Sequence, residues 1–347
     1  MQKAKRTKQI RLIGLIGLIG LISLTGCGKK SANSSSESGK VADLPTEKSV
    51  LAFSADSAYQ FIADQVDFGP RVPGTPAHEA CARYLKAKLA SYGAITQMEQ
   101  GQLINYAGEN QQICNIVGRF NPELKRRILL CAHWDCRPWS DQEENYDLRK
   151  EPVLGANDGA SGVGVLLEVA RQLQNAGNLG IDIVFFDVED MGTPSFYTGK
   201  EREDTWCLGS QLWAQQRVLD GTNKDYRFGI LLDMVGSPDA TFPKEYYSKD
   251  YARAYTEKIW RTAQQLGYGR LFRDVRSYPL TDDHYYVNTI ADIPCVDVIH
   301  YDAQSGTGFA HYWHTQHDDM SNISKATLDA VGKTVLAVIQ NEYAGNK

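Results

Sequence analysis

The sequence predicts an α/β fold in which three α/β/α layers form around a central mixed, mostly parallel sheet. The first observation is that short apolar runs, typical of buried strands, alternate along the chain with longer segments typical of helices. The second is that histidines and carboxylates follow several of the apolar runs, where an open α/β sheet places its ligand crevice. The third is a composition of 42% hydrophobic and 23% charged residues, which is sufficient for a sizeable core.

The N-terminal segment is expected to lie outside that fold. Basic residues precede the apolar stretch 12–24, which is too short to span a bilayer comfortably. This stretch ends in LTGC, and small residues before a cysteine resemble the lipobox of bacterial lipoproteins. We therefore expect residues 1–26 to be a lipoprotein signal peptide. The lipid on Cys27 would hold an exported protein on a membrane, facing the bacterial periplasm. A plain signal peptide and a short signal anchor are the alternatives.

The next segments lead from a tether into the folded domain. The Ser-rich stretch 27–48 has almost no apolar residues, so we expect it to be a disordered tether. A single catalytic domain is expected over 49–347. Its first element is a predicted helix over 56–66. The loop 68–75 is rigid because it is full of Gly and Pro, and 76–92 is predicted to be an amphipathic helix.

The remaining elements alternate between strands and helices. The apolar runs 112–120 and 127–132 predict strands, and 160–176 predicts a helix with one apolar face. The run 181–186 begins just after Gly180 and predicts a buried strand. The later predicted elements are 206–219 (helix), 228–234 (strand), 249–266 (helix), 294–299 (strand) and 324–343 (helix).

Six cysteines remain after Cys27. An exported protein can form disulfides, but Cys114, Cys131 and Cys295 lie within apolar runs, where a free cysteine behaves as a small hydrophobic residue. No C-x-x-C pair occurs. We interpret the cysteines as structural, and the sequence assigns no bridge.

Acids and histidines cluster at predicted strand ends and in the loops between them. Since the carboxyl ends of parallel strands share one edge of a sheet, these side chains can converge. Each also has an ordinary explanation: Asp158 could cap a helix, Asp135 could be a loop acid, and the acids after 181–186 could be a polar strand exit. Together they are hard to explain as coincidence. The set is His133, Asp135, Asp158, Asp187, Glu189, Asp190, Asp233 and His314.

The donor types in this set favour zinc. Histidine nitrogen combined with carboxylate oxygen and one open position is typical of catalytic zinc, whereas thiolate-rich sets are typical of structural zinc. Two carboxylates and one histidine would leave a coordination position for substrate or water. The net charge of −5 and the absence of any RNA- or DNA-binding motif argue against nucleic acid as a partner.

Seven motifs carry a resemblance that runs from about Ser49 to the C-terminus: FGPRVPG, AHWD, GANDGASG, FFDVED, LLDMVG, TDDH and YWHT. Together they resemble the zinc aminopeptidases of the co-catalytic type and their relatives, the animal-type glutaminyl-peptide cyclotransferases. The resemblance implies the zinc aminopeptidase-like fold and one zinc ion per chain. The zinc ligands it implies are Asp158, Asp190 and His314.

The same resemblance implies roles for the other site residues. Glu189 corresponds to the general acid/base, and Asp233 and Asp282 to acids of its proton network. Trp313 corresponds to an indole beside the zinc histidine, in the substrate pocket. His133 corresponds to a ligand of the second metal in the aminopeptidases, with Asp135 orienting it. We expect neighbouring carboxylates to raise the pKa of Glu189.

Two sequence contexts, TDDH and YWHT, favour the cyclotransferases over the aminopeptidases. Two features differ from the animal enzymes: Asp297 stands where they have a histidine, and the loop 191–205 offers Met191, Phe196 and Tyr197 in place of their substrate-facing Trp. Among the other histidines, we predict that His78 is on the surface and that His284 is a structural hydrogen-bonding residue. His311 and His317 are the alternatives to His314 as ligand.

The resemblance implies a transferase that cyclises the N-terminal glutamine of peptides and proteins to pyroglutamate and releases ammonia. The first alternative is a two-metal zinc aminopeptidase, for which His133, Asp158, Asp190, Asp233 and His314 supply every ligand. The second alternative is a non-catalytic surface lipoprotein on the same scaffold, which the retained acids and Trp313 argue against.

Overall fold

The computed structural model describes residues 52–173 and 179–344, which all belong to one compact unit, Ser49–Lys347. The predicted signal peptide, Cys27 and the predicted tether lie outside the described residues. Within the described ranges, no helix is both long enough and apolar enough to cross a membrane.

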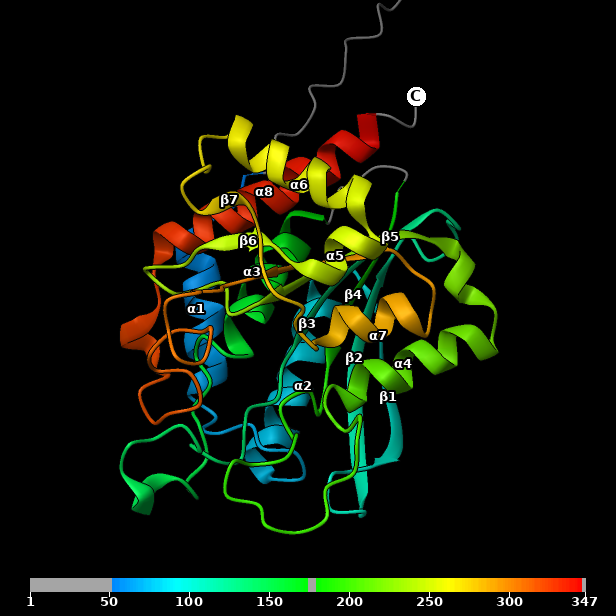
Figure 1. Cartoon of the computed structure of the whole chain (residues 1–347). Coiled ribbons are helices and arrows are strands. Elements are labelled where there is room, and N and C mark those ends of the chain that lie inside the picture. The colour runs from blue at the N-terminus through cyan, green and yellow to red at the C-terminus, as the bar shows by residue number, and fades with distance from the viewer. Residues whose placement is uncertain (1–51, 174–178, 345–347) are drawn as a thin grey trace, which may run out of the picture. The chain divides into compact units, whose positions relative to one another are not determined.

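A six-stranded mixed sheet forms the centre of this unit (Figure 1). Strands β4, β3, β5 and β8 run parallel to one another, and β2 is antiparallel to both β1 and β4. The predicted mixed, mostly parallel sheet is therefore confirmed. The spatial order is β1 (Ile95–Ile104), β2 (Asn110–Phe120), β4 (Gly180–Phe186), β3 (Arg127–His133), β5 (Tyr226–Asp233) and β8 (Cys295–Ile299).

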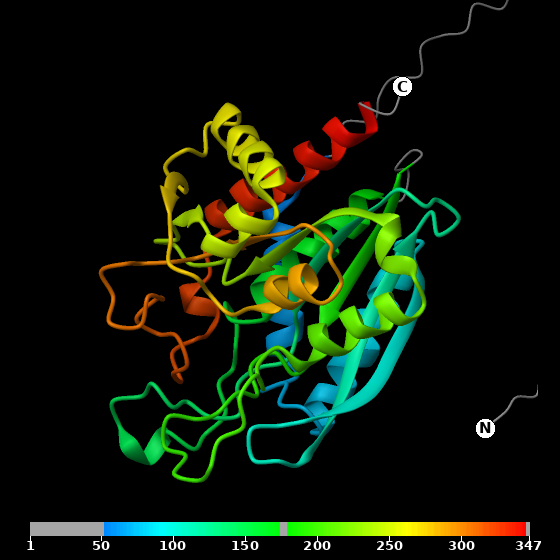
Figure 2. The ribbon, with the colours of Figure 1, turned by 45° about the vertical axis from the view of Figure 1, so that its right-hand side comes forward.

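Helices cover both faces of the sheet, which makes the three layers. On one face, α2 packs on β1 and β2, α3 packs on β3, β4 and β5, and α1, α6 and α8 complete the layer. On the other face, α4 packs on β1 and β2, while α5 and α7 pack on β8 (Figure 2). The bounds are α1 (Ala55–Val66), α2 (Pro76–Ser91), α3 (Ala160–Gln172), α4 (Leu208–Leu219), α5 (Tyr246–Tyr251), α6 (Arg253–Gln265), α7 (Asp283–Thr289) and α8 (Lys325–Ala344).

Short elements complete the chain. Strands β6 (Phe242–Lys244) and β7 (Phe272–Arg276) form a separate parallel pair. The 3-10 turns are η1 (Tyr146–Leu148), η3 (Thr222–Asp225) and η4 (Met320–Asn322).

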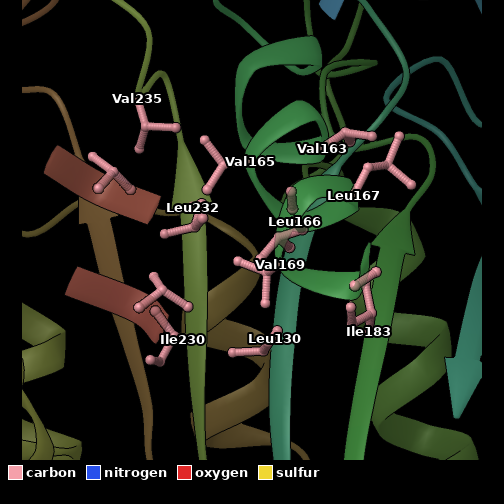
Figure 3. Close-up of a cluster of buried hydrophobic side chains, with 14 of the residues drawn as sticks. Leu130, Val163, Val165, Leu166, Leu167, Val169, Ile183, Ile230, Leu232 and Val235 are labelled. Carbon is pink, nitrogen blue, oxygen red and sulfur yellow. The ribbon is translucent and has the colours of Figure 1, made fainter. Parts of the chain in front are cut away.

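The core divides into two layers because side chains alternate across each strand. On β3, Leu130 faces the cluster that includes α3, whereas Leu129 and Cys131 face the cluster under α4 and α7. Figure 3 shows Leu130, Ile183 and Ile230 from three parallel strands against the apolar face of α3. Burying each such side chain contributes roughly 1.5–3 kcal/mol, so the apolar strands are fixed in the middle layer.

Four elements differ from the predicted ones. Strand β1 was not predicted, because it is an edge strand whose polar and exposed residues outnumber its buried ones. The segment 249–266 is two helices, broken where Ala252 leaves helical geometry (φ −128°, ψ 30°). Helix α7 was not predicted, because it is only seven residues long; its N-cap is Asp282, whose side chain accepts a hydrogen bond from the N–H of Asp283. Helix α3 ends at Gln172, and 174–178 lie outside the described residues.

Candidate active site

The predicted site residues meet at the carboxyl ends of the parallel strands. Strand β3 has β4 on one side and β5 on the other, so the chain connections diverge from it, and a crevice is expected at that point. His133 ends β3, and Asp233 ends β5. Figures 1 and 2 show the segments 134–159 and 187–207 together at this end of the sheet.

Asp158, Asp190 and His314 form a buried triad with the geometry of a metal site. His314 Nε2 lies 3.1 Å from Asp190 Oδ1 and 3.5 Å from Asp158 Oδ2. Zinc bonds to these donors measure about 2.0–2.1 Å, so two ligand atoms of a tetrahedral site lie roughly 3.3 Å apart. One oxygen or nitrogen from each residue therefore fits around a single cation. The three side chains predicted as zinc ligands converge.

The loop before α3 holds Asp158 rigidly in this triad. The buried Asp318 carboxylate accepts hydrogen bonds from the backbone N–H groups of Asn157 (2.8 Å) and Asp158 (2.9 Å). Gly159 has φ +97°, and a Cβ there would lie 2.5 Å from the carbonyl oxygen of Asp135. Only glycine fits at that turn. Gly159 occupies the N-cap position of α3, so the alternative that Asp158 caps this helix is wrong.

Arg71 of the FGPRVPG motif supports the same loop. Its guanidinium is fully buried and donates to the carbonyl oxygens of Trp134 (3.1 Å), Leu154 (2.8 Å) and Gly155 (2.7 Å). One side chain thereby fixes the loop after β3 and the loop before α3 relative to each other. The sequence indicated a rigid loop but gave no signal for this bridging role.

Asp135 positions the acids that follow β4. Its carboxylate accepts hydrogen bonds from the N–H groups of Glu189 (3.1 Å) and Asp190 (3.2 Å). The same carboxylate lies 3.5 Å from His133 Nδ1, an ion-pair contact without a hydrogen bond, so the orienting role of Asp135 stays a prediction. Arg137 reaches the other side of Asp190, at 3.5 Å, and pairs with Asp141, whose carboxylate is 3.6 Å from His314 Nδ1. Charged side chains therefore hold both sides of the triad.

His133 belongs to a second triad that shares Asp158 with the first. His133 Nε2 lies 3.0 Å from Asp158 Oδ1 and 3.2 Å from Asp233 Oδ1. These distances also match the edge of a tetrahedral site, and Asp158 offers one oxygen to each triad. The arrangement can hold one cation or two bridged by Asp158.

Carboxylates outnumber basic groups in this region, so the pKa values of several site residues are raised. Burial acts to lower the pKa of His314, but the charge of Asp190 and the contacts with Asp141 and Asp158 outweigh it and raise the pKa to about 10. Burial raises the pKa of Asp233 to about 7, assisted by the charge of Asp158 and opposed by His133. A divalent cation would displace the protons on these groups, which is the usual coupling between metal binding and proton release.

Glu189 faces the cavity beside the first triad. Its side chain is 13% exposed, and Oε1 accepts a hydrogen bond from the Cys207 thiol at 3.2 Å. Burial raises the pKa of Glu189 well above its usual value, and the charges of Asp190, Asp282 and Asp283 raise it further, against His133. The expected direction is confirmed, but burial is a larger cause than the neighbouring carboxylates. A carboxylate oxygen of Asp282 lies within 4.8 Å of Glu189 and of the Cys207 sulfur, so these three side chains are close enough to hold one cation together.

A cavity of about 470 Å³ opens over these groups, a size suited to a small-molecule or single-residue substrate. The Trp313 ring stacks on His314, with 3.6 Å between centroids. The loop before α4 supplies Asp204 and Trp206 to the lining, and α7 supplies Tyr286. None of Met191, Phe196 and Tyr197, which the sequence offered in place of a substrate-facing Trp, lines this cavity. Trp206 lies just after the loop 191–205 and lines the cavity, where the Arg137 guanidinium stacks over it at 4.9 Å.

Two histidine predictions are decided by burial. His78 is 6% exposed, stacks on Trp134 at 4.1 Å and lies 2.8 Å from Asp187, so its predicted surface position is wrong. Asp187 also accepts a bond from the N–H of Cys114, so it faces away from the metal triads despite its place beside them in sequence. His284 Nε2 bonds to Glu245 at 2.9 Å, which confirms its predicted structural role.

The cysteines and the other histidines take no part in the triads. All six cysteines of the described residues are free thiols, and no disulfide forms among them. His300 accepts a hydrogen bond from the N–H of Thr241. Neither His311 nor His317 belongs to a group of potential metal ligands within the described ranges, whereas His314 does.

The chain is similar to a family of peptidases and to known cyclotransferases. Residues 115–339 match peptidase family M28. A glutaminyl-peptide cyclotransferase from Bothrops jararaca is 25% identical over 303 residues, covering 79% of this chain and 77% of that protein.

Solved structures are more similar still. The glutaminyl cyclase of Bacteroides thetaiotaomicron, bound to N-acetylhistamine, is 50% identical with a TM-score of 0.80, covering 84% of this chain and 98% of that one. A Zn-dependent exopeptidase from Parabacteroides distasonis is 49% identical with a TM-score of 0.81, covering 84% and 99%. The fold is thus shared, while the two neighbours carry different activity names.

Proposed function

The chain belongs to peptidase family M28, and we propose that within this family it is a zinc-dependent glutaminyl cyclase. The substrates are peptides and proteins that begin with glutamine, and the products are an N-terminal pyroglutamyl residue and ammonia. The observation that carries the proposal is Glu189: a largely buried carboxyl with a raised pKa, at the wall of a cavity that also contains a metal-type triad.

Asp158, Asp190 and His314 would hold the zinc ion. Bound there, zinc supplies Lewis-acid polarisation of the side-chain amide oxygen. The α-amine of the substrate attacks the amide carbon, and the C–N bond to the departing NH₂ group breaks. Glu189 accepts a proton from the attacking amine and donates it to the leaving nitrogen, so that ammonia departs. A carboxyl with a raised pKa is suited to both transfers.

The surrounding residues orient these groups and limit water. The Cys207 thiol donates to Glu189 Oε1 while His133 Nδ1 lies 3.9 Å from Oε2, so the carboxyl has a restricted orientation, and Asp282 lies nearby. Asp233 lines the cavity and can accept a hydrogen bond from the substrate amine. Trp206, Phe309 and Trp313 line much of the cavity with aromatic surface, which disfavours hydrolysis by excluding water.

The aminopeptidase alternative rests on a specific observation, the second triad of His133, Asp158 and Asp233. The deciding assay incubates the purified protein with one Gln-initiated peptide and measures released ammonia and released free glutamine side by side. We expect ammonia without free amino acid. Release of glutamine at a comparable rate would favour the aminopeptidase.

Metal content distinguishes the cyclase from the aminopeptidase independently of turnover. We propose one zinc per chain for full activity, in the triad of Asp158, Asp190 and His314. Metal analysis of the active protein should give about one equivalent. A requirement for two equivalents would assign the second triad to a working metal and would support the aminopeptidase.

We also propose that the protein is an exported lipoprotein anchored through Cys27, on the basis of the LTGC context and the polar segment that follows it. Cys27→Ser should release the protein from the membrane fraction and leave turnover unchanged. If the Ser variant stayed in the membrane fraction, the apolar stretch 12–24 would itself be the anchor.

A further inference from the structure

A second cavity lies along the chain segments that form the first. Its volume is about 280 Å³. On one side, Ser277 and Tyr278 line the second cavity, and the residues that follow, 279–282, line the first. On the other side, Ile299 lines the first cavity and 301–304 line the second. Two strips of chain thus border both cavities, so the second cavity lies next to the first along these strips.

Aromatic rings line both cavities. From Trp313 beside His314, the ring centroids step to Phe309 over 4.7 Å and to Tyr301 over 6.4 Å. The last step, to Tyr278, is 6.4 Å. We call these four side chains the aromatic path. Tyr278 is 70% exposed. A large aromatic ring gains from burial, so exposed rings are a feature of surfaces that bind a partner.

Two arginines line the far end of the path. Arg273 and Arg276 both line the second cavity, with Asp302 as its one acid. Arg276 is held by Asp250 at 2.7 Å and by the Tyr246 ring at 3.8 Å. Arg273 is exposed, and among residues 52–173 and 179–344 no hydrogen bond or ion pair engages its side chain. Its guanidinium is therefore free to pair with an incoming carboxylate.

We infer that the aromatic path and Arg273 bind the residues that follow the substrate's N-terminal glutamine and favour acidic side chains. This inference rests on the proposed function, because it requires a peptide whose first residue occupies the active-site cavity. An extended peptide advances about 3.3–3.6 Å per residue, so the ring steps from Trp313 to Tyr278 are spanned by at most about five residues. Counted from a first residue beside Trp313, the residue beside Tyr278 is therefore no later than about the sixth, and acids at positions four and five test the preference.

The experiment compares kcat/KM for ammonia release from four amidated peptides: Gln-Gly, Gln-Gly-Ala-Ala-Ala, Gln-Gly-Ala-Glu-Glu and Gln-Gly-Ala-Lys-Lys. Contacts with exposed rings should raise kcat/KM roughly two- to tenfold from the dipeptide to the neutral pentapeptide. The acidic pentapeptide should exceed the basic one by roughly 1.5- to fivefold per ion pair at low salt, and less at high salt.

Four variants separate the path from general surface effects. Arg273→Ala should remove the preference for acid, and Tyr278→Ala should reduce the gain with length. The matched controls are Arg126→Ala, an exposed arginine at the opposite end of the parallel strands, and Tyr251→Ala, a half-exposed tyrosine outside both cavities. Both controls should behave as the unaltered protein.

The outcomes distinguish this inference from the proposed function. Cyclisation of all four peptides with equal kcat/KM would overturn the aromatic path and leave the cyclase intact. Absence of ammonia from every peptide would overturn the cyclase. Calorimetric affinities of the same peptides would then still decide the path, which predicts tightest binding for the acidic pentapeptide. Equal affinities would overturn the path too.

Discussion

The two ends of the same parallel strands both bury charge, but they treat it in opposite ways. At the amino ends, Arg127 of β3 and Asp182 of β4 form a buried pair, and the Tyr226 hydroxyl of β5 donates to the same carboxylate. Arg127 also donates to four backbone carbonyl groups, so its donors are used. Each charge there has its partner within the fold, which is the condition for a buried ion pair to be structural.

At the carboxyl ends the charges do not balance. The acids of the triads and their neighbours outnumber the histidines and Arg137. Behind them, Asp283 and Asp297 are fully buried, and neither carboxylate has a hydrogen-bond partner within the described residues. A fold retains such a cluster at a cost, and the excess of negative charge is what a metal cation offsets. The contrast indicates that balance, not burial, separates structural charge from functional charge.

The largest expected effect comes from removing a metal ligand at the unbalanced end. Asp190→Asn takes one donor from the first triad. Because losing a residue that merely orients a ligand costs 10- to 100-fold, losing the ligand itself should weaken zinc binding by at least about 100-fold. Zinc content and ammonia release should fall together. Asp187→Asn is the control, because Asp187 also follows strand β4 but pairs with His78 instead of a metal ligand. The Asp187→Asn variant should keep its zinc.

Glu189→Gln should be the next largest effect and should separate proton transfer from metal binding. The amide has nearly the same shape, so the fold and the zinc should remain, while ammonia release falls by roughly 10²- to 10⁴-fold. Zinc analysis and single-turnover kinetics on the same sample give both values. If this variant lost zinc while Asp190→Asn kept it, the tasks of the two neighbouring acids would be reversed.

At the balanced end, Arg127→Met should cost stability rather than catalysis. Removing one partner of a buried pair leaves Asp182 with the Tyr226 hydroxyl and a distant Arg119, and such losses are about 3–5 kcal/mol. Urea denaturation should show the decrease in the free energy of unfolding, while kcat per folded molecule stays unchanged. Arg126→Met, at the exposed neighbour, is the control. A loss below about 1 kcal/mol would mean that the pair is not essential to this end of the sheet.

The same contrast explains how much of the molecule the sequence could predict. The parallel strands, and the gathering of acids and histidines at their ends, follow from local patterns: apolar runs, followed by residues such as His133 and Asp190. The choice of Asp158, Asp190 and His314 as metal ligands came from the family resemblance. What could not be predicted depends on contacts between distant positions. His78 is buried because of Asp187, 109 residues away, and nothing beside His78 in the sequence indicates this. Trp206 lines the cavity together with Phe309 and Trp313, residues far from it in the sequence.

Edge positions were also beyond prediction. Strand β1 lies at the edge of the sheet and is mostly polar, so hydrophobic periodicity gives little signal for it. Likewise, Asp297 lies in an apolar run where the sequence suggested only a departure from the animal cyclotransferases. Its complete burial without a hydrogen-bond partner depends on β8 packing beside β5 and against the helices α5 and α7.

The smallest effect should come from Asp297→Asn, as a change in how stability depends on pH. Burial raises the pKa of Asp297 well above its usual value, and the charges of Asp282, Glu245 and Asp233 raise it further; His284 Nδ1 lies 3.5 Å away. The folded state therefore holds a proton that the unfolded state releases above a pKa of about 3.9. The contribution of Asp297 to the free energy of unfolding is therefore greatest below that pH. It falls as the pH rises toward the pKa of the folded state, by at most about 1.4 kcal/mol per pH unit.

Asparagine cannot ionise, so the free energy of unfolding of Asp297→Asn should decline less between pH 5 and pH 8 than that of the unaltered protein. The difference should be below the single-group limit, because removing one charge eases ionisation of the neighbouring Asp282. Urea denaturation at both pH values, with zinc held constant, measures it. Asp147→Asn, in an exposed turn, should leave the slope unchanged. An equal slope for Asp297→Asn and the unaltered protein would show that this carboxyl does not carry the excess charge that distinguishes the two ends.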